Sequence, residues 1–161
     1  MGSIFRFDKD VDTDQIIASQ YLLFPTIDEM KVHTFESLNS DFATSVKPGD
    51  FVVADENFGC GSSREQAPSV LKALGVKAVI AKSFARIFYR NAINIGLLAI
   101  ECDTDSIDDG DELELDIERG IITNLTNGAI IQIEPLPPVM IKMLQDGGLV
   151  EHIKKNGDFN L

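Results

Sequence analysis

Residues 51–81 have the sequence FVVADENFGCGSSREQAPSVLKALGVKAVIA, and the fold can be worked out from this segment. Its first residues, Phe51–Ala54, are apolar and are bounded by turn-forming residues, which predicts a short buried strand. A helix is predicted from about Ser63 to Leu74, and a second strand follows at Lys77–Ala81. A strand, a helix and a strand in this order predict a parallel β-α-β crossover.

The same alternation continues toward the carboxyl end. Ser83 is predicted to open a second helix, because apolar residues after it recur at helical spacing, and Leu97–Ile100 predicts a third strand. After Asp103 apolar and polar residues alternate with period two, which predicts an antiparallel meander. Its outer strands are expected at 112–117 and 129–133, and its turns at 118–120 and 126–128.

The chain is therefore predicted to be one α/β domain over residues 1–161. Its mixed sheet combines β-α-β crossovers with an antiparallel meander. Two helices, at about Val139–Gln145 and Leu149–Lys154, follow the meander. Residues 19–49 show no clear period and are expected to hold a long mobile loop.

The composition excludes several classes of partner. Of 161 residues, 14 are lysine or arginine and 26 are aspartate or glutamate, so the formal net charge is −12. Such a chain is a poor ligand for nucleic-acid phosphates and anionic membranes, and no segment approaches the roughly 20 apolar residues that span a bilayer. The amino terminus lacks the apolar core of a secretory signal, and Cys60 and Cys102 form no Cys-x-x-Cys pair. We expect a cytoplasmic protein that binds neither nucleic acid nor membrane.

The negative charge is unevenly distributed. Residues 57–100 contain six cations and one acid, Glu65, for a net charge of +5, whereas the segments before and after them carry −7 and −10. A cationic segment in an acidic chain can attract an anionic small molecule that the net charge repels. Solvated helix faces explain the same distribution, so charge alone does not choose between these interpretations.

The loop Asn57–Gln66 carries the densest chemical signal. It follows a predicted strand at the carboxyl end, where open α/β sheets bind ligands. Gly59 and Gly61 allow backbone amides to approach an anion closely. Two overlapping capping boxes, from Ser62 to Glu65 and from Ser63 to Gln66, predict a helix start whose free amides point into the loop. With Arg64 these amides would bind a carboxylate or phosphate, although a plain capped helix start is the simpler interpretation.

Two familiar catalytic sites do not fit this loop. A phosphate-binding P-loop requires a Gly-Lys-Ser/Thr ending, which GCGSSR lacks. A Ser-His-Asp hydrolase requires a histidine, and His33 and His152 lie in no motif, so both are expected at the surface. A serine here needs another activator, and Arg64 could stabilise its alkoxide in a desolvated site.

Three ordered motifs connect the chain to a known family: DVDTDQIIASQYL (residues 10–22), NFGCGSSREQAP (57–68) and AKSFARIFYRNAINIGLL (81–98). Together they resemble the swivel domain of the aconitase superfamily, in the short free-standing form of isopropylmalate dehydratase small subunits. The resemblance implies a β/β/α swivel fold and a separate large subunit that bears a [4Fe-4S] cluster on three cysteines. The two cysteines of this chain are too few, so the cluster is expected on the partner, and Cys60 is expected to be a structural or incidental thiol.

The resemblance also implies roles for individual residues. Ser62 matches the general base, whose alkoxide removes a proton next to a carboxylate while the cluster acts as a Lewis acid on the leaving hydroxyl. Arg64 matches the arginine that binds a substrate carboxylate, and Ser63 and Gly61 would contact the substrate beside it. Asp14 matches an aspartate at the edge of the site, although an Asx turn cap is an equally good interpretation.

Residues at the start of the third motif are expected to flank the same pocket. These residues are Lys82, Ser83 and Arg86. For Arg86, a structural ion pair is as good an interpretation as a substrate contact.

The loop after the first motif is expected to select the substrate. It consists of Tyr21, Leu22, Leu23 and Phe24. Relatives that act on homoaconitate resemble one another in carrying an arginine here, whereas residues 10–30 of this chain contain no arginine or lysine. The apolar side chains suit an isopropyl group, and a third carboxylate buried there would be unpaired. The loop does not separate 2-isopropylmalate from citramalate or dimethylmalate, because one methyl group changes binding by only about 1–3 kcal/mol.

Two functional hypotheses follow. In the first, the chain is the small subunit of a cluster-dependent hydro-lyase that isomerises 2- and 3-isopropylmalate in leucine biosynthesis, within a heterodimer or heterotetramer. Homoaconitate and the smaller branched malates are the alternative dicarboxylate substrates. In the second, the chain is a non-catalytic scaffold domain that uses GCGSSR to bind anions.

Overall fold

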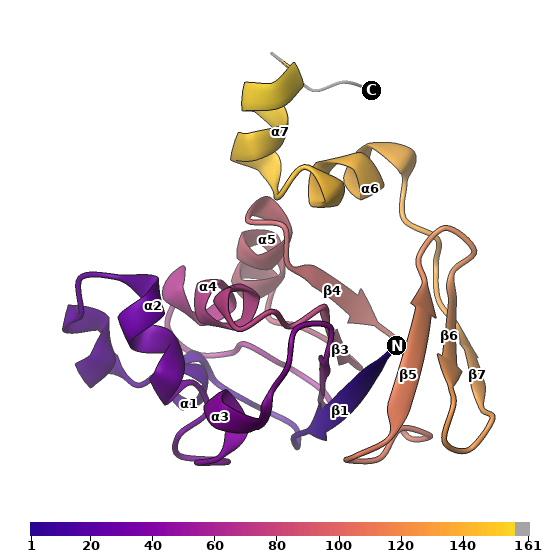
Figure 1. Ribbon diagram of the computed structural model, residues 1–161, viewed down its shortest axis with the longest axis horizontal. Helices are drawn as coiled ribbons and strands as arrows, with labels where there is room; N and C mark the ends of the chain where they lie inside the picture. Colours follow the sequence, from indigo (N-terminus) through magenta and orange to yellow (C-terminus); the bar gives the residue numbers. More distant parts are fainter. Residues whose placement is uncertain (157–161) are drawn as a thin grey trace.

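The computed structural model describes residues 1–156. Its strands form one seven-stranded sheet in the order β4-β3-β2-β1-β5-β6-β7 (Figure 1). The strands are β1 (Gly2–Arg6), β2 (Phe51–Val53), β3 (Ala78–Ala81), β4 (Leu98–Glu101), β5 (Glu112–Asp116), β6 (Ile121–Asn124) and β7 (Ile130–Gln132). Strands β1 to β4 pair in parallel, and β5 to β7 form an antiparallel meander. The predicted α/β class with a mixed sheet is confirmed.

Two helices make the predicted crossovers. Helix α4 (Gln66–Ala73) connects β2 to β3, and α5 (Arg86–Asn94) connects β3 to β4. The other helical segments are α1 (Thr13–Ile16), η1 (Ser19–Leu23), α2 (Ile27–Met30), η2 (Lys31–His33), α3 (Phe42–Ser45), α6 (Pro138–Gln145) and α7 (Leu149–Asn156). Among the described helices, none has the length and apolar character needed to cross a membrane.

Strand β1 joins the two halves of the sheet, and the sequence pattern did not predict it. Ile4 pairs in parallel with Phe51 of β2, while Ser3 pairs in antiparallel register with Glu112 of β5. The segment GSIFR places two apolar residues side by side and has no period-two alternation. Its strand conformation depends on partners that lie far away in the sequence.

The sheet separates two hydrophobic cores. Helices α4 and α5 cover one face, where Val52 and Val79 pack against Leu71 and Phe88. On the other face, Ile80 and residues of the meander share a second core. The meander therefore folds over the parallel strands (Figure 1), which gives the expected β/β/α layering.

Both crossover helices begin later than predicted. Helix α5 starts at Arg86 rather than Ser83, because residues before it are extended and the Ala85 amide bonds the Phe58 carbonyl at 2.9 Å. Helix α4 starts at Gln66, and Glu65 caps it without a side-chain hydrogen bond. Both predicted capping boxes in the GCGSSR loop are therefore wrong.

The expectation of a long loop at residues 19–49 is also wrong. The segment forms short helical turns, and Phe35 and Phe42 are fully buried in the helix-side core. The Phe35 ring stacks on Phe7, with 4.1 Å between ring centroids. Apolar residues spaced irregularly along a series of short turns produce no single period, which explains why the pattern was missed.

His152 does not lie at the surface as predicted. Its side chain in α7 is fully buried, and Nδ1 lies 2.8 Å from a carboxylate oxygen of Asp146. The burial arises because α7 packs against α5 and α6, a tertiary contact with no local signal. His33 is half-buried in the other half of the molecule.

Candidate active site

Main-chain hydrogen bonds hold the three sequence motifs together beyond the ends of the strands. The Gly59 amide donates to the Val11 carbonyl at 2.7 Å, and the Thr13 amide donates to the Cys60 carbonyl at 2.8 Å. On the other side, the Phe58 amide donates to the Ser83 carbonyl at 3.0 Å. The GCGSSR loop is therefore held between the first and third motifs, at the carboxyl end of β2.

A cavity of about 220 Å³ lies where the three motifs meet. Its walls combine hydroxyl, amide and guanidinium groups with apolar side chains. The lining residues are Thr13, Gly59, Gly61, Ser62, Ser63, Arg64, Ala85, Arg86, Ile87, Phe88 and Asn91. Five of the predicted site residues are therefore in one cavity, namely Gly61, Ser62, Ser63, Arg64 and Arg86.

The turn before α4 leaves both serine hydroxyls free. Gly59 and Gly61 have positive φ angles of 84° and 90°, which favour glycine. Ser62 and Ser63 are exposed, and neither side chain has a hydrogen-bond partner among residues 1–156. Because neither hydroxyl caps the helix, both are available to a bound molecule.

Thr13 fixes the position of Ser62 from the neighbouring motif. Its hydroxyl donates a 2.7 Å hydrogen bond to the Ser62 carbonyl, and its side chain is almost fully buried. Thr13 belongs to the first motif, but its position in the sequence predicted no role for it. The capping box predicted at Ser62 occurs instead beside Thr13, where Asp12 and Gln15 cap the start of α1.

Arg64 keeps part of its guanidinium free. Its Nη1 donates to Asp14 at 3.0 Å and to the Ile17 carbonyl at 3.1 Å. Its Nε and Nη2 have no hydrogen-bond partner in the described part of the chain, and two such donors suit a bidentate carboxylate. The hydrogen bond from Arg64, together with the Ser19 amide, holds the pKa of the Asp14 carboxyl below its usual value. Asp14 does not line this cavity, but it holds Arg64, which does.

The three site residues predicted in the third motif do not line the same cavity. Arg86 lines the cavity and forms no ion pair with any described residue. Lys82 instead forms ion pairs with Asp55 at 3.5 Å and with Asp105. The Ser83 hydroxyl accepts a 2.8 Å hydrogen bond from the Asn57 amide. Neither Lys82 nor Ser83 lines the cavity.

The loop Tyr21–Phe24 lies beside a second cavity of about 210 Å³. Asp14 and Tyr21 line this second cavity, so the ion pair from Arg64 to Asp14 connects the two spaces. Leu22 and Phe24 pack partly against the core, whereas Leu23 is 87% exposed. Leu23 is therefore the apolar side chain of this loop that is exposed and can contact a ligand or a partner.

Sequence reasoning missed the polar cluster that closes this second cavity. The Tyr21 hydroxyl donates to Glu36, whose other oxygen lies 2.7 Å from Nδ1 of His33. The imidazole stacks on the Tyr21 ring with 3.8 Å between centroids. The hydrogen bond to Glu36 raises the pKa of the Tyr21 hydroxyl. The spacing from His33 to Glu36 was the available signal, since residues three apart meet on a helical turn.

The two cysteines are not a cluster site. Cys60 and Cys102 are free thiols, and burial raises the pKa of both, that of Cys102 to about 11. No group of three or more potential metal ligands exists within residues 1–156. Iron-sulfur clusters require three or four thiolates, so the residues of this chain do not fit such a group.

Comparison with known proteins identifies the family of this chain. Residues 10–105, which contain all three motifs, match the model of the aconitase C-terminal domain. The chain belongs to this family. It is 57% identical over 155 residues to 3-isopropylmalate dehydratase small subunit 1 of Archaeoglobus fulgidus, with 96% of each chain covered.

Two further relatives have names that indicate different substrates. The chain is 52% identical to the methanogen homoaconitase small subunit of Methanothermobacter thermautotrophicus, over 98% of this chain and 92% of that one. It also superimposes on the crystal structure of 3-isopropylmalate dehydratase from Methanocaldococcus jannaschii with a TM-score of 0.91 and 47% identity, covering 97% and 93% of the two chains. The swivel fold expected from the motifs is thereby confirmed.

Proposed function

We propose that this chain is the small subunit of a hydro-lyase that interconverts 2- and 3-isopropylmalate by dehydration and rehydration. One observation carries the proposal. The free hydroxyl of Ser62 and the partly free guanidinium of Arg64 share one cavity at the carboxyl end of β2. The names of relatives at 57% and 47% identity support the same activity. Leucine biosynthesis in the cytoplasm is the setting that this reaction implies.

Ser62 is proposed as the general base. As an alkoxide it takes the proton from the carbon next to a carboxylate while hydroxide leaves the neighbouring carbon, which gives an unsaturated dicarboxylate. In the rehydration the serine gives its proton to the carbon that carried the hydroxyl, and hydroxide adds to the carbon that lost the proton. Arg64 stabilises the alkoxide, because a cation close to an ionised hydroxyl favours its charged form. The hydrogen bond from Thr13 to the Ser62 carbonyl holds the base in position.

The arginines are proposed to bind the two carboxylates of the substrate. Arg64 offers Nε and Nη2 to one of them as a bidentate pair. Arg86 enters from helix α5 as a second cation without an ion pair among the described residues. Ser63 and the backbone at Gly61 complete the contacts. Asp14 acts through Arg64, which it orients.

The large subunit is proposed to supply the [4Fe-4S] cluster, which provides a Lewis acid for the leaving hydroxyl when the two subunits meet. The exposed position of Ser62 and Ser63 in the free chain supports a site that is completed by another protein. The free small subunit is therefore expected to be inactive.

Replacement of the base tests this proposal. In the complex reconstituted with the large subunit, Ser62→Ala should lower kcat at least about 100-fold, because a positioned general base contributes about 10²–10⁴-fold. Ser69→Ala is the matched control, since the Ser69 hydroxyl bonds the Glu65 carbonyl within helix α4, away from the cavity. A Ser62→Ala complex with kcat within a few-fold of wild type would show that Ser62 is not the base.

The substrate preference is a separate proposal. The relatives include a homoaconitase small subunit, so similarity alone does not choose the substrate. Residues 10–30 contain no cation to pair with a third carboxylate, and Leu23 is exposed at the loop tip. We propose a branched malate with two carboxylates, and the name of the relative at 57% identity supports 2-isopropylmalate ahead of citramalate and dimethylmalate.

A charge placed in the loop tests the preference. Leu23→Arg should lower kcat/KM for 2-isopropylmalate at least about tenfold, because a cation that the large subunit covers beside an isopropyl group loses hydration without a partner. It should raise kcat/KM for homoaconitate, whose third carboxylate would pair with the arginine. Leu38→Arg, which changes a 43% exposed residue outside the loop, is the control. Unchanged ratios in Leu23→Arg would remove this loop from substrate selection.

The non-catalytic scaffold is the second candidate. It is favoured by the free guanidinium edge of Arg64, which can bind an anion without a partner chain. Calorimetric titration of the free subunit with 2-isopropylmalate tests it. Tight binding by the free chain, combined with an inactive reconstituted complex, would favour the scaffold over the enzyme.

A further inference from the structure

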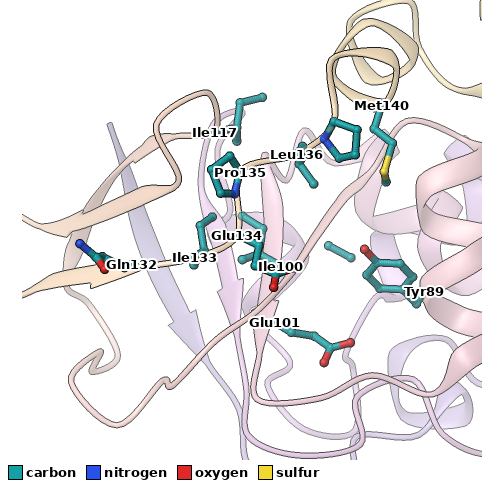
Figure 2. A pocket seen from close by; sticks show the side chains of 12 residues that line it. Tyr89, Ile100, Glu101, Ile117, Gln132, Ile133, Glu134, Pro135, Leu136 and Met140 are labelled. Carbon is teal, nitrogen blue, oxygen red and sulfur yellow. The ribbon is translucent and has the colours of Figure 1, made fainter. Parts of the chain in front are cut away.

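A cavity larger than the candidate active site lies away from Ser62. It is a groove of about 640 Å³ between the two outer strands of the sheet. Tyr89 of α5 and Glu101 of β4 lie on one side, Gln132 and Glu134 at the end of β7 on the other, and Met140 of α6 above them (Figure 2). The curl of the sheet thus brings its two edges to one groove.

Both edges present unpaired backbone groups to the groove. The Cys102 amide donates to the Ala81 carbonyl of β3. Because the backbone groups of successive residues point to opposite sides of a strand, the amides and carbonyls of Ala99 and Glu101 point away from β3. At the end of β7 the Ile133 amide donates to the Gly120 carbonyl in the turn before β6. By the same alternation, the backbone groups of Gln132 and Glu134 point away from β6. Such edges are templates for an added strand.

The side chains of the groove show which kind of segment it suits. Ile100, Ile133 and Leu136 give it an apolar lining. Glu101 and Glu134 add two carboxylates, and no described residue forms an ion pair or a side-chain hydrogen bond with either. An apolar strand with a basic side chain complements this lining in both shape and charge.

The groove is continuous with the candidate active site along helix α5. Arg86 lines the site cavity and also a shallow depression of about 290 Å³, which Tyr89 shares. Tyr89 in turn lines the groove. A large subunit that covers Ser62 would therefore reach the groove by extending along helix α5. Ile130 of β7, which is 67% exposed, adds apolar surface at the border of the groove.

We propose that the groove receives an extended segment of the large subunit, which carries a lysine or arginine and adds as a strand between β4 and β7. The segment anchors the swivel domain to its partner at a distance from the catalytic serine. The proposal rests on the proposed function for the identity of the partner. It adds a second contact between the subunits, outside the catalytic cavity.

Amide hydrogen exchange tests the added strand directly. In the complex, exchange at the amides of Glu101, Gln132 and Glu134 should slow at least about tenfold relative to the free subunit. The Ile100 and Ile131 amides face neighbouring strands and should change less. Unchanged exchange at the three edge amides would overturn the proposal. Protection already present in the free subunit would also overturn it, because this chain or a second copy would then fill the groove.

Charge reversal tests the basic residue. Glu101→Lys combined with Glu134→Lys should raise the Kd for the large subunit at least about tenfold. Glu112→Lys combined with Glu114→Lys, at exposed positions of β5, changes the net charge equally and should leave the Kd within about twofold. Glu101→Gln with Glu134→Gln removes the charges with little change of shape and should weaken binding less.

The outcomes separate this proposal from the proposed function. Equal Kd values for the two lysine pairs in an active complex would overturn the groove contact and leave the enzyme assignment intact. Weakened binding with a normal kcat at saturating small subunit would support an anchoring contact. A wild-type complex without hydro-lyase activity would instead contradict the proposed function.

Discussion

At the scale of single residues, the site depends on one buried hydroxyl. Thr13→Val removes the hydrogen bond to the Ser62 carbonyl while keeping the shape of the side chain. We expect unfolding free energy to fall by about 1 kcal/mol and kcat of the complex to fall about tenfold, because the base is displaced. Thr13→Ser keeps the hydroxyl and should retain most activity. Urea denaturation and steady-state kinetics measure both effects, and a fully active Thr13→Val would show that the bond does not position Ser62.

Arg64 also acts through the geometry of its side chain. Arg64→Lys keeps the charge but loses the planar pair of donors that suits a carboxylate. We expect kcat/KM for isopropylmalate to fall about 100-fold, with most of the change in KM. Arg90→Lys on the exposed face of α5 is the control and should stay within about twofold. Equal kinetics for the two variants would contradict a bidentate contact at Arg64.

At the scale of elements, packing of α5 against the GCGSSR loop requires a glycine. A Cβ at Gly59 would lie 2.3 Å from the Phe88 side chain, whereas a Cβ at Gly110 would meet nothing within 4 Å. Both glycines have a φ of 84°, so alanine strains the backbone equally at the two positions. We expect Gly110→Ala to cost about 1 kcal/mol and Gly59→Ala at least about 2 kcal/mol more, from overlap with Phe88. Equal melting temperatures for the two variants would show that the loop can move away from α5.

Residues 19–49 are held at their centre and exposed at their ends. Phe35 and Phe42 are buried, and the Phe35 amide bonds the Ile16 carbonyl at 2.8 Å. In the free subunit, we expect amide exchange to be faster across residues 19–33 than in β2 or β3, and slowest within the segment at Phe35. Exchange across residues 19–33 should slow when the large subunit binds. Uniformly slow exchange in the free subunit would contradict the predicted mobility.

At the scale of the whole molecule, an ion-pair network joins the carboxyl ends of the parallel strands. Asp55 follows β2 and accepts hydrogen bonds from Arg6 of β1 at 2.7 Å and from the Thr104 hydroxyl at 3.0 Å. Burial by itself would raise the pKa of Asp55, but the Thr104 hydroxyl and the charges of Arg6 and Lys82 outweigh it and lower the pKa below its usual value. The network therefore stabilises the protein only while Asp55 is ionised.

Because of this network, the free energy of unfolding depends on pH. A carboxyl whose pKa is lowered by folding stabilises the native state above its unfolded pKa, and this stability is lost as the pH falls through the folded value. We expect the unfolding free energy to decline below about pH 4, and the decline to be shallower in Asp55→Asn. Asp28→Asn, an exposed partner of Lys31, should leave the slope unchanged. Parallel curves for wild type and Asp55→Asn would exclude Asp55 as a source of the acid sensitivity.

The sequence by itself determined the crossovers, the meander and the catalytic loop of this aconitase-family chain. These features depend on local information, since periodicity predicts a strand or helix and GCGSSR is continuous in the chain. Only the tertiary structure decided that β1 is central, that Ser62 caps no helix, that Thr13 holds its carbonyl and that His152 is buried. Each of these depends on a partner distant in sequence, such as Glu112 for Ser3, and burial and strand pairing are set by which segments meet in space.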